Sequence, residues 1–184
     1  MRLPADFQAT IIRTARLRLR PWLDRDREAF AAMHADPDVM VDEAKLLSRE
    51  ESDRKLDRYS ACFEQYGFCR WCVETLDGQF IGYTGIMRAS DRHPLGPHDD
   101  IGWRLTRAAW GFGYATEAAK ASLDDAFLRV GLTEVLAYTA PDNIRSQGVM
   151  ARLGLQRDPA RDFVAAYDGT NKWQGLVWVS RHAA

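Results

Sequence analysis

The sequence carries almost no net charge of either sign, because 25 basic and 26 acidic residues leave a formal charge of −1 over 184 residues. No broad electrostatic attraction to nucleic acid or to an anionic membrane is therefore expected. No apolar run approaches the roughly 18 residues of a membrane-spanning helix, and residues 1–22 contain no apolar signal core. These absences favour one cytoplasmic globular domain over residues 1–184, without nucleic acid or membrane as a partner.

Cysteine is also scarce, with three residues, Cys62, Cys69 and Cys72. The C-x-x-C pair has no second pair of ligands at zinc spacing, and the four histidines form no ligand pattern. Reduced structural cysteines are therefore expected, and no metal. His93 and His98 flank a loop that precedes a predicted strand, and contact with a substrate is one interpretation of them.

Hydrophobic periodicity and turn residues predict the order β-α-α-β-β-β-α-β-α-β. This order indicates a mixed α/β (α+β) fold that combines antiparallel hairpins with one β-α-β unit. Expected strands cover residues 16–22, 68–75, 79–87, 100–106, 134–140 and 172–180, and expected helices cover 24–35, 48–66, 114–130 and 143–153. The segment 158–171 is predicted to be irregular.

Residue types at the helix ends support these boundaries. Asp24 is the expected N-cap of the first helix, and Ser48 with Glu51 three residues later forms a capping-box pattern for the second. Asn143 is a plausible N-cap of the last helix, and Gly154 a plausible C′ residue.

Two glycines one residue apart stand before the third predicted helix, in RAAWGFGYATEAAKASL, residues 107–123. Gly111 and Gly113 permit positive φ angles and leave the N–H groups of the first helical turn uncovered, which suits an anion. The stretch lacks the Lys-Ser or Lys-Thr of a Walker loop, and Thr116 replaces the third glycine of a Rossmann fingerprint. A tight strand-to-helix turn explains the two glycines equally well.

DIGWRLTRAAWGFGYATEAAKASLDDAF, residues 100–127, and NIRSQGVMARLGL, residues 143–155, closely resemble the GCN5-related N-acetyltransferase (GNAT) superfamily. The segments TARLRLRPW, ADPDVM and GFCRWCVE also resemble its RimJ/RimL branch of ribosomal-protein N-terminal acetyltransferases. Residues 161–180 are less typical of that branch, and Ala108 stands where the superfamily prefers Gln or Arg.

The resemblance implies a central, mostly antiparallel sheet of six to seven strands, with two parallel strands splayed apart and about four flanking helices. It implies acetyl-CoA as cosubstrate, with the pantetheine arm in the splayed cleft and the pyrophosphate on the N–H groups of residues 110–115. The implied cofactor-binding residues are Trp103, Arg104, Leu105, Trp110, Gly111, Phe112, Gly113, Tyr114, Ala115, Thr116, Asn143 and Ser146. Arg107, Arg145 and Arg152 are candidates for the 3′-phosphate, or are solvated charges.

The implied reaction is direct attack of a primary amine on the thioester in a ternary complex. Ser146 is the expected hydrogen-bond donor to the leaving thiolate, and Tyr138 or water could share that role. Asp100 is the candidate base, and a purely structural carboxylate is the alternative. As a base, Asp100 would give an Asp100→Asn variant a steeper alkaline dependence of kcat/KM.

The acceptor is a peptide N-terminus or a small-molecule amine. A cationic acceptor could be attracted by the acidic residues Asp36, Asp38, Asp42 and Glu43. A non-catalytic acyl-CoA sensor is the alternative function. A homodimer is common in this superfamily, and the sequence leaves the oligomeric state open.

Overall fold

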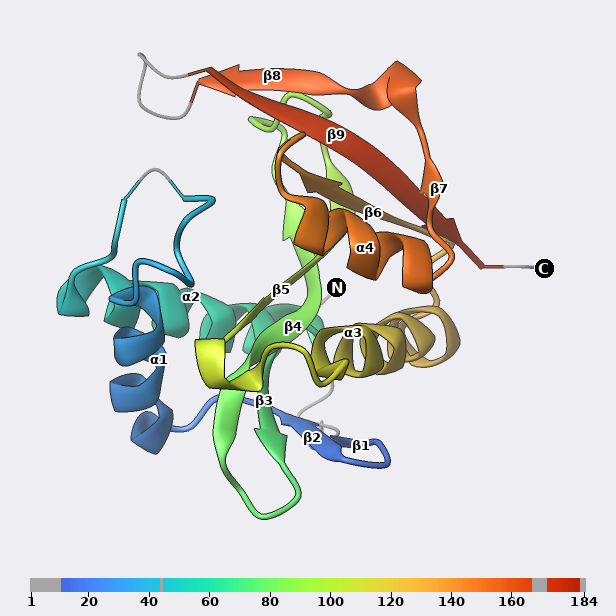
Figure 1. The fold of residues 1–184 in the computed structure, drawn as a ribbon. Helices are drawn as coiled ribbons and strands as arrows, with labels where there is room; N and C mark the ends of the chain where they lie inside the picture. Colours follow the sequence, from blue (N-terminus) through green and yellow to red (C-terminus); the bar gives the residue numbers. More distant parts are fainter. Residues whose placement is uncertain (1–10, 44, 167–171, 183–184) are drawn as a thin grey trace.

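The computed structural model describes residues 11–43, 45–166 and 172–182. Within these ranges the strands form one sheet in the order β1-β2-β3-β4-β5-β6-β9-β7, with β8 paired to β9 (Figure 1). The β5–β6 pairing is parallel, and every other pairing within the described ranges is antiparallel. The strands are β1 (Ile12–Arg13), β2 (Leu17–Arg20), β3 (Arg70–Thr75), β4 (Phe80–Ala89), β5 (His98–Leu105), β6 (Glu134–Thr139), β7 (Gln156–Arg157), β8 (Phe163–Ala166) and β9 (Lys172–Arg181).

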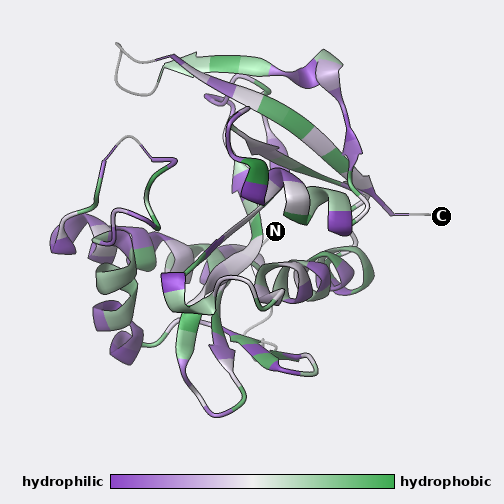
Figure 2. Cartoon of the chain, in the orientation of Figure 1, coloured by the Kyte–Doolittle hydropathy of each residue, from purple (hydrophilic) through white to green (hydrophobic). Residues whose placement is uncertain are grey.

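The helices belong to two hydrophobic clusters. Helices α1 (Arg27–His34) and α2 (Arg49–Tyr66) pack with β2–β4 around Phe30, Tyr59 and Trp71. Helices α3 (Tyr114–Asp125) and α4 (Ile144–Arg152) pack with β5 and β6 in a cluster that includes Leu123 and Met150. Figure 2 shows hydrophilic residues along the outer turns of α1 and α2. The predicted mixed α/β arrangement, with a mostly antiparallel sheet and four α-helices in the described residues, is confirmed.

The sheet of the described residues has nine strands, against six to seven expected, because β1, β7 and β8 add short pieces. The prediction that residues 158–171 are irregular is wrong for β8, and residues 167–171 lie outside the described ranges. Phe163 and Ala165 alternate with exposed neighbours and are buried against β9. Period-2 alternation over four residues was too short to stand out from the sequence.

The first helix begins differently from the prediction, which made Asp24 its N-cap. A short 3₁₀ turn covers Asp24–Asp26 and makes no side-chain cap with Asp24. Asp26 instead accepts a hydrogen bond from the N–H of Leu23 at 2.8 Å. Arg20 explains this change, because its guanidinium contacts both carboxylate oxygens of Asp26 at 2.7 and 2.8 Å and fixes that residue in the core.

The signals predicted at the other helix ends are confirmed. Ser48 and Glu51 form the expected capping box, since the Glu51 N–H donates to Ser48 Oγ and the Ser48 N–H donates to Glu51 Oε2. Gly154 adopts φ +74° after α4. The three cysteines are free and buried, as expected for reduced structural thiols.

His34 gives the fold a pH dependence. The ring is fully buried on α1 with Nδ1 2.8 Å from the Phe30 carbonyl oxygen. Burial, helped by the positive charge of Lys55, lowers the pKa of His34 to about 3. A histidine in the unfolded chain has a pKa near 6.5. As pH falls from about 6.5 toward 3, the unfolded chain therefore binds a proton that the buried ring of the native state does not bind.

We therefore expect the free energy of unfolding to fall by about 2 kcal/mol between pH 7 and pH 5 through His34 alone. Urea unfolding of the wild type and of His34→Gln at both pH values measures this slope. His182→Gln serves as the control, because His182 is exposed. An equal slope in the wild type and His34→Gln would contradict the prediction.

Candidate active site

Strands β5 and β6 diverge after a single paired position. Asp100 pairs with Leu136, and no further pair joins the two strands in the described residues. Each strand remains fully paired on its other edge, β5 with β4 and β6 with β9. The main-chain groups of β5 beyond Ile101 therefore face a gap instead of a neighbouring strand, and the splay that the resemblance implied is present.

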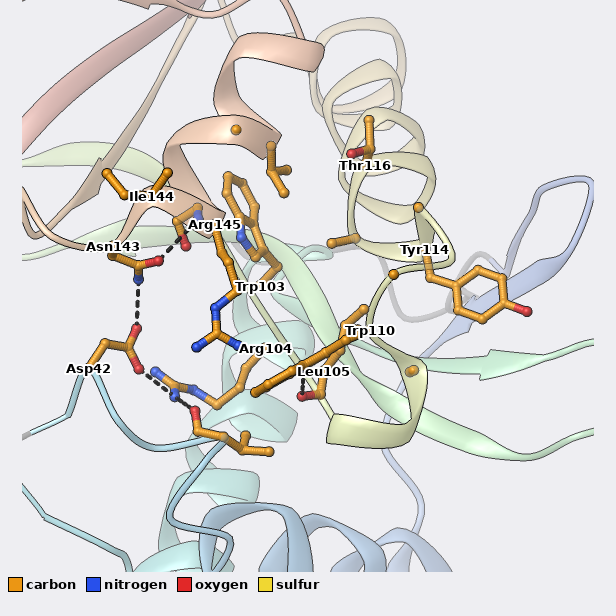
Figure 3. A pocket seen from close by; sticks show the side chains of 18 of the residues that line it. Asp42, Trp103, Arg104, Leu105, Trp110, Tyr114, Thr116, Asn143, Ile144 and Arg145 are labelled. Atoms are coloured by element: carbon orange, nitrogen blue, oxygen red, sulfur yellow. Dashed lines mark hydrogen bonds and ion pairs between the residues drawn. The ribbon is translucent and has the colours of Figure 1, made fainter.

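This gap widens into a cleft of about 610 Å³, a volume typical of small-molecule sites. Its walls come from the end of β5, the loop before α3, the first turns of α3 and α4, and the segment after α1 (Figure 3). The cleft brings together all the predicted cofactor-binding residues except Phe112. The lining residues are Asp38, Val39, Val41, Asp42, Trp103, Arg104, Leu105, Ala109, Trp110, Gly111, Gly113, Tyr114, Ala115, Thr116, Asn143, Ile144, Arg145, Ser146, Gly148, Val149 and Arg152.

The glycine loop has the backbone that the sequence predicted. Gly111 and Gly113 have φ angles of +84° and +78°, and Gly113 is the N-cap of α3 without a side-chain cap. The first-turn N–H groups of α3 therefore remain available to an anion at the positive end of the helix dipole. Phe112 points away from the cleft, with an exposed side chain stacked on Tyr114.

Arg16 supports this loop, and the sequence reasoning missed it. Its guanidinium donates to the Phe112 carbonyl oxygen at 2.9 Å, pairs with Glu117 at 2.6 Å and lies 4.7 Å from the centre of the Tyr114 ring. Arg16 and its partner Glu117 are 101 positions apart in the sequence, and no local pattern connects them. The arginine fixes the loop conformation, and its charge is balanced by Glu117.

Trp110 connects the two walls of the cleft. Its indole N–H donates to the Leu105 carbonyl oxygen at 3.0 Å, and the Arg145 guanidinium lies 4.3 Å from the ring centre (Figure 3). Arg145 and Arg152 line the cleft and have no ion pair among the described residues, whereas Arg107 pairs with Asp38. Of the three arginines predicted to bind a phosphate, Arg145 and Arg152 therefore line the cleft without a carboxylate partner among the described residues.

Asn143 is the N-cap of α4, because its Oδ1 accepts from the Ser146 N–H at 3.1 Å. Its Nδ2 donates to Asp42 Oδ2 at 3.1 Å, and Asp42 Oδ1 accepts from Arg104 at 2.9 Å. Arg104 also lies beside Tyr83 on β4. Burial raises the pKa of Tyr83, but the cations of Lys55 and Arg104 outweigh this effect and lower that pKa to about 8. Ser146 lines the cleft on the same turn as Asn143.

Asp100 lies outside the lining of the cleft. Its carboxylate pairs with Arg70, and both residues are buried. Arg70 also donates to the Asp100 carbonyl oxygen at 3.0 Å. The arrangement places a buried ion pair at the point where β5 and β6 separate, so Asp100 has a structural partner that the sequence did not reveal.

His93, in the loop after β4, and His98, the first residue of β5, lie together and are not among the residues that line the cleft. The His93 and His98 rings are 4.7 Å apart, and both contact Tyr138 on β6 at 5.1 and 5.8 Å. No group of three or more His, Cys, Asp or Glu side chains is arranged to hold a metal ion within the ranges 11–43, 45–166 and 172–182.

Comparison with known families supports the geometry. The acetyltransferase (GNAT) domain family matches residues 16–156, which is most of the chain. The chain belongs to the GNAT family. As a member, it is an N-acetyltransferase, and its splayed strands and glycine loop belong to the GNAT fold.

No helix of the described residues is long and apolar enough to cross a membrane.

Two relatives are similar to this GNAT protein over more than three quarters of its length. YkkB of Bacillus subtilis, an uncharacterised protein, is 31% identical over 144 residues, which are 77% of this chain and 83% of YkkB. The FsC-acetyl coenzyme A-N(2)-transacetylase of Aspergillus fumigatus is 31% identical over 151 residues, which are 78% of this chain and 64% of that enzyme.

Solved structures agree with the fold. An acetyltransferase from Agrobacterium tumefaciens superposes with a TM-score of 0.79 at 27% identity, covering 99% of this chain and 100% of that one. RimL, a ribosomal alpha-N-protein acetyltransferase in complex with coenzyme A, superposes with a TM-score of 0.74 at 14% identity over 94% of this chain and 98% of its own. The second similarity concerns the fold alone.

Proposed function

We propose that this GNAT protein transfers an acetyl group from acetyl-CoA to a primary amine, in a ternary complex and without a covalent enzyme intermediate. The observation that carries the proposal is the splay of β5 from β6, which leaves the main chain of Trp103–Leu105 facing the cleft beside the glycine loop. Buried main-chain groups need partners, and the amides of a pantetheine arm would supply them. The name of the A. fumigatus relative, which includes acetyl coenzyme A, supports this choice of cosubstrate.

The residues of the cleft fit the cosubstrate along its length. The uncapped N–H groups of Tyr114–Thr116 suit a pyrophosphate, and the unpaired Arg145 and Arg152 suit the remaining phosphate. The lining includes apolar side chains such as Val149 beside a few polar groups, as small-molecule sites usually do. The bound cosubstrate supplies an activated acetyl group as a thioester.

The chain's own residues then position and stabilise the reacting groups. A main-chain N–H of β5 near Trp103–Leu105 would stabilise the developing oxyanion. The Ser146 hydroxyl, on the first turn of α4, can donate a hydrogen bond to the leaving sulfur. An α-amine with a pKa near 8 reaches its neutral form far more easily than a lysine near 10.4, so a peptide N-terminus needs only a weak base.

The proposal also covers the acceptor amine and membership of the RimJ/RimL branch. A protein N-terminus is the acceptor implied by the RimJ/RimL resemblance, and a small-molecule amine is the alternative. Calorimetric titration with acetyl-CoA, followed by thiol release with spermidine, tyramine and short peptides with free or acetylated N-termini, tests both. Binding with amine-dependent release of CoA is expected. Binding without release on any amine would favour the non-catalytic sensor, and absence of binding would contradict the proposed function.

Replacing Ser146 by alanine is expected to lower kcat by about 100-fold, the lower end of the usual range for a lost proton donor. The Kd of acetyl-CoA should change by less than threefold, because Ser146 acts on the leaving sulfur. Ser122→Ala is the matched control, since Ser122 is a buried hydroxyl of α3 outside the cleft lining. An unchanged kcat in Ser146→Ala would remove this residue from the mechanism.

A further inference from the structure

A buried arginine joins three strands of the sheet at the point where β5 leaves β6. Arg70 belongs to β3 and is only 8% exposed. Its guanidinium donates to the carbonyl oxygens of Gly85 on β4 and of Asp100 on β5, the second at 3.0 Å, and it pairs with the Asp100 carboxylate. Asp100 is also the residue of β5 that pairs with Leu136 on β6. Arg70 therefore holds β5 at the position from which the two parallel strands diverge.

A glycine on β5 makes room for this guanidinium. Gly102 faces Gly85 across the two antiparallel strands β4 and β5. A Cβ on Gly102 would lie 2.9 Å from Nη2 and 3.0 Å from Cζ of Arg70, closer than ordinary contacts of a side-chain carbon. Gly102 does not have a positive φ angle, so the backbone does not require glycine here. The guanidinium packed on its Cα explains why a side chain is missing.

The same face of β5 is held a second time further along the strand. Side chains at positions 100, 102 and 104 share this face, because alternate residues of a strand point to the same side. Arg104 donates to the Val39 carbonyl oxygen at 2.5 Å. It also pairs with Asp42 at 2.9 Å and with Glu43 at 2.7 Å (Figure 3). Two arginines thus bind β5 to the first half of the chain, whereas β6 pairs with β9.

We propose that Arg70 is a positioning residue for acetyl-CoA binding, which holds β5 away from β6 beyond Asp100 and so keeps the cleft open for the pantetheine arm. The inference rests on the proposed function, because it takes that arm as the occupant of the splay.

The physical argument is a competition for β5. Paired strands lie about 4.8 Å apart, which leaves no room for a ligand between them. The main-chain groups of β5 and β6 would gain partners by pairing further, so contacts on the other side of β5 must oppose this. The planar guanidinium of Arg70 supplies them through three acceptor atoms, the Gly85 and Asp100 carbonyl oxygens and the Asp100 carboxylate.

The test compares two ligands by calorimetry, acetyl-CoA and 3′-phospho-ADP, which has the same phosphates but no pantetheine arm. Arg70→Lys keeps the positive charge beside Asp100, but a lysine ammonium lacks the planar fork that reaches all three acceptors. Gly102→Ala keeps Arg70 and displaces its guanidinium with a Cβ. Both variants should bind acetyl-CoA at least about 5-fold more weakly than the wild type, as for loss of one or two hydrogen bonds to the arm. Their Kd for 3′-phospho-ADP should stay within about twofold, because the glycine loop is unchanged.

Arg20→Lys is the matched control. Arg20 is also buried and contacts both carboxylate oxygens of Asp26 at 2.7 and 2.8 Å. It lies on β2, which pairs with β1 and β3 and is remote from β5. This variant should lose stability as Arg70→Lys does, and keep wild-type affinity for both ligands. Melting temperatures check folding, and Gly102→Ala decides the test alone if Arg70→Lys does not fold.

Unchanged affinity for acetyl-CoA in Gly102→Ala and in folded Arg70→Lys would overturn the inference. An equal loss of affinity for both ligands would also overturn it, because that result indicates general loosening of the site. So would a loss of acetyl-CoA affinity in Arg20→Lys as large as that in Arg70→Lys. A wild type that does not bind acetyl-CoA would contradict the proposed function, and the inference with it.

Discussion

Asp100→Asn is expected to lower the free energy of unfolding by about 3–5 kcal/mol, the cost of leaving one member of a buried ion pair without its partner. The Arg70 guanidinium is buried and has the Asp100 carboxylate as its ionic partner. An asparagine could still accept a hydrogen bond, but it would leave the cation uncompensated in the interior of the sheet.

Urea unfolding measures the loss, and Asp99→Asn is the matched control next to it in the chain. Asp99 pairs with Arg88, whose side chain is 46% exposed, so its loss should cost about 1 kcal/mol or less. The pH profile of kcat/KM in Asp100→Asn separates the two interpretations of Asp100. A stable variant with a steeper alkaline limb would support the base prediction, whereas an unstable variant with an unchanged profile would make Asp100 structural.

Gly113→Ala is expected to weaken acetyl-CoA binding by about 10- to 100-fold, as for loss of one or two charge-assisted hydrogen bonds. Gly113 caps α3 at φ +78°, a region that alanine enters only at a cost of about 1–3 kcal/mol. The loop would relax away from this conformation, and the N–H groups of Tyr114 and Ala115 would no longer converge.

Gly131→Ala is the control for strain alone. Gly131 has φ +80° at the end of the π-helical turn Ala126–Val130, and open space surrounds its Cα. Both variants should lose similar stability, but calorimetry should show weaker acetyl-CoA binding only in Gly113→Ala. Equal affinity in both would mean that the glycine loop is a turn and does not bind phosphate.

Local signals in the sequence were sufficient for most elements of this GNAT fold. The capping box at Ser48, the αL residue Gly154 and the two glycines of the loop are decided by interactions within a few positions of the chain. Periodicity located the long strands and helices for the same reason. The wrong N-cap at Asp24 shows the limit, since Arg20, which also pairs with the buried Glu74, recruits Asp26 instead.

Describing the cleft required both the sequence motifs and the tertiary structure. The residues predicted to bind the cofactor followed from motifs that resemble a family, and all of them except Phe112 line one cleft. The support of the loop by Arg16 and the closure of the cleft by Trp110 and Arg145 join segments far apart in the chain. No local pattern marks such contacts, because each partner alone is an ordinary surface arginine or aromatic residue.

The sequence by itself therefore determined the order of the main elements and the glycine loop with the helix that follows it. The tertiary structure alone decided the partner of each charge. Asp100 is bound to Arg70, Asp38 to Arg107, and Asp42 to both Arg104 and Asn143. The physical reason is that backbone preference acts over a few residues, whereas the energy of a charge depends on burial and on partners that only packing brings within reach.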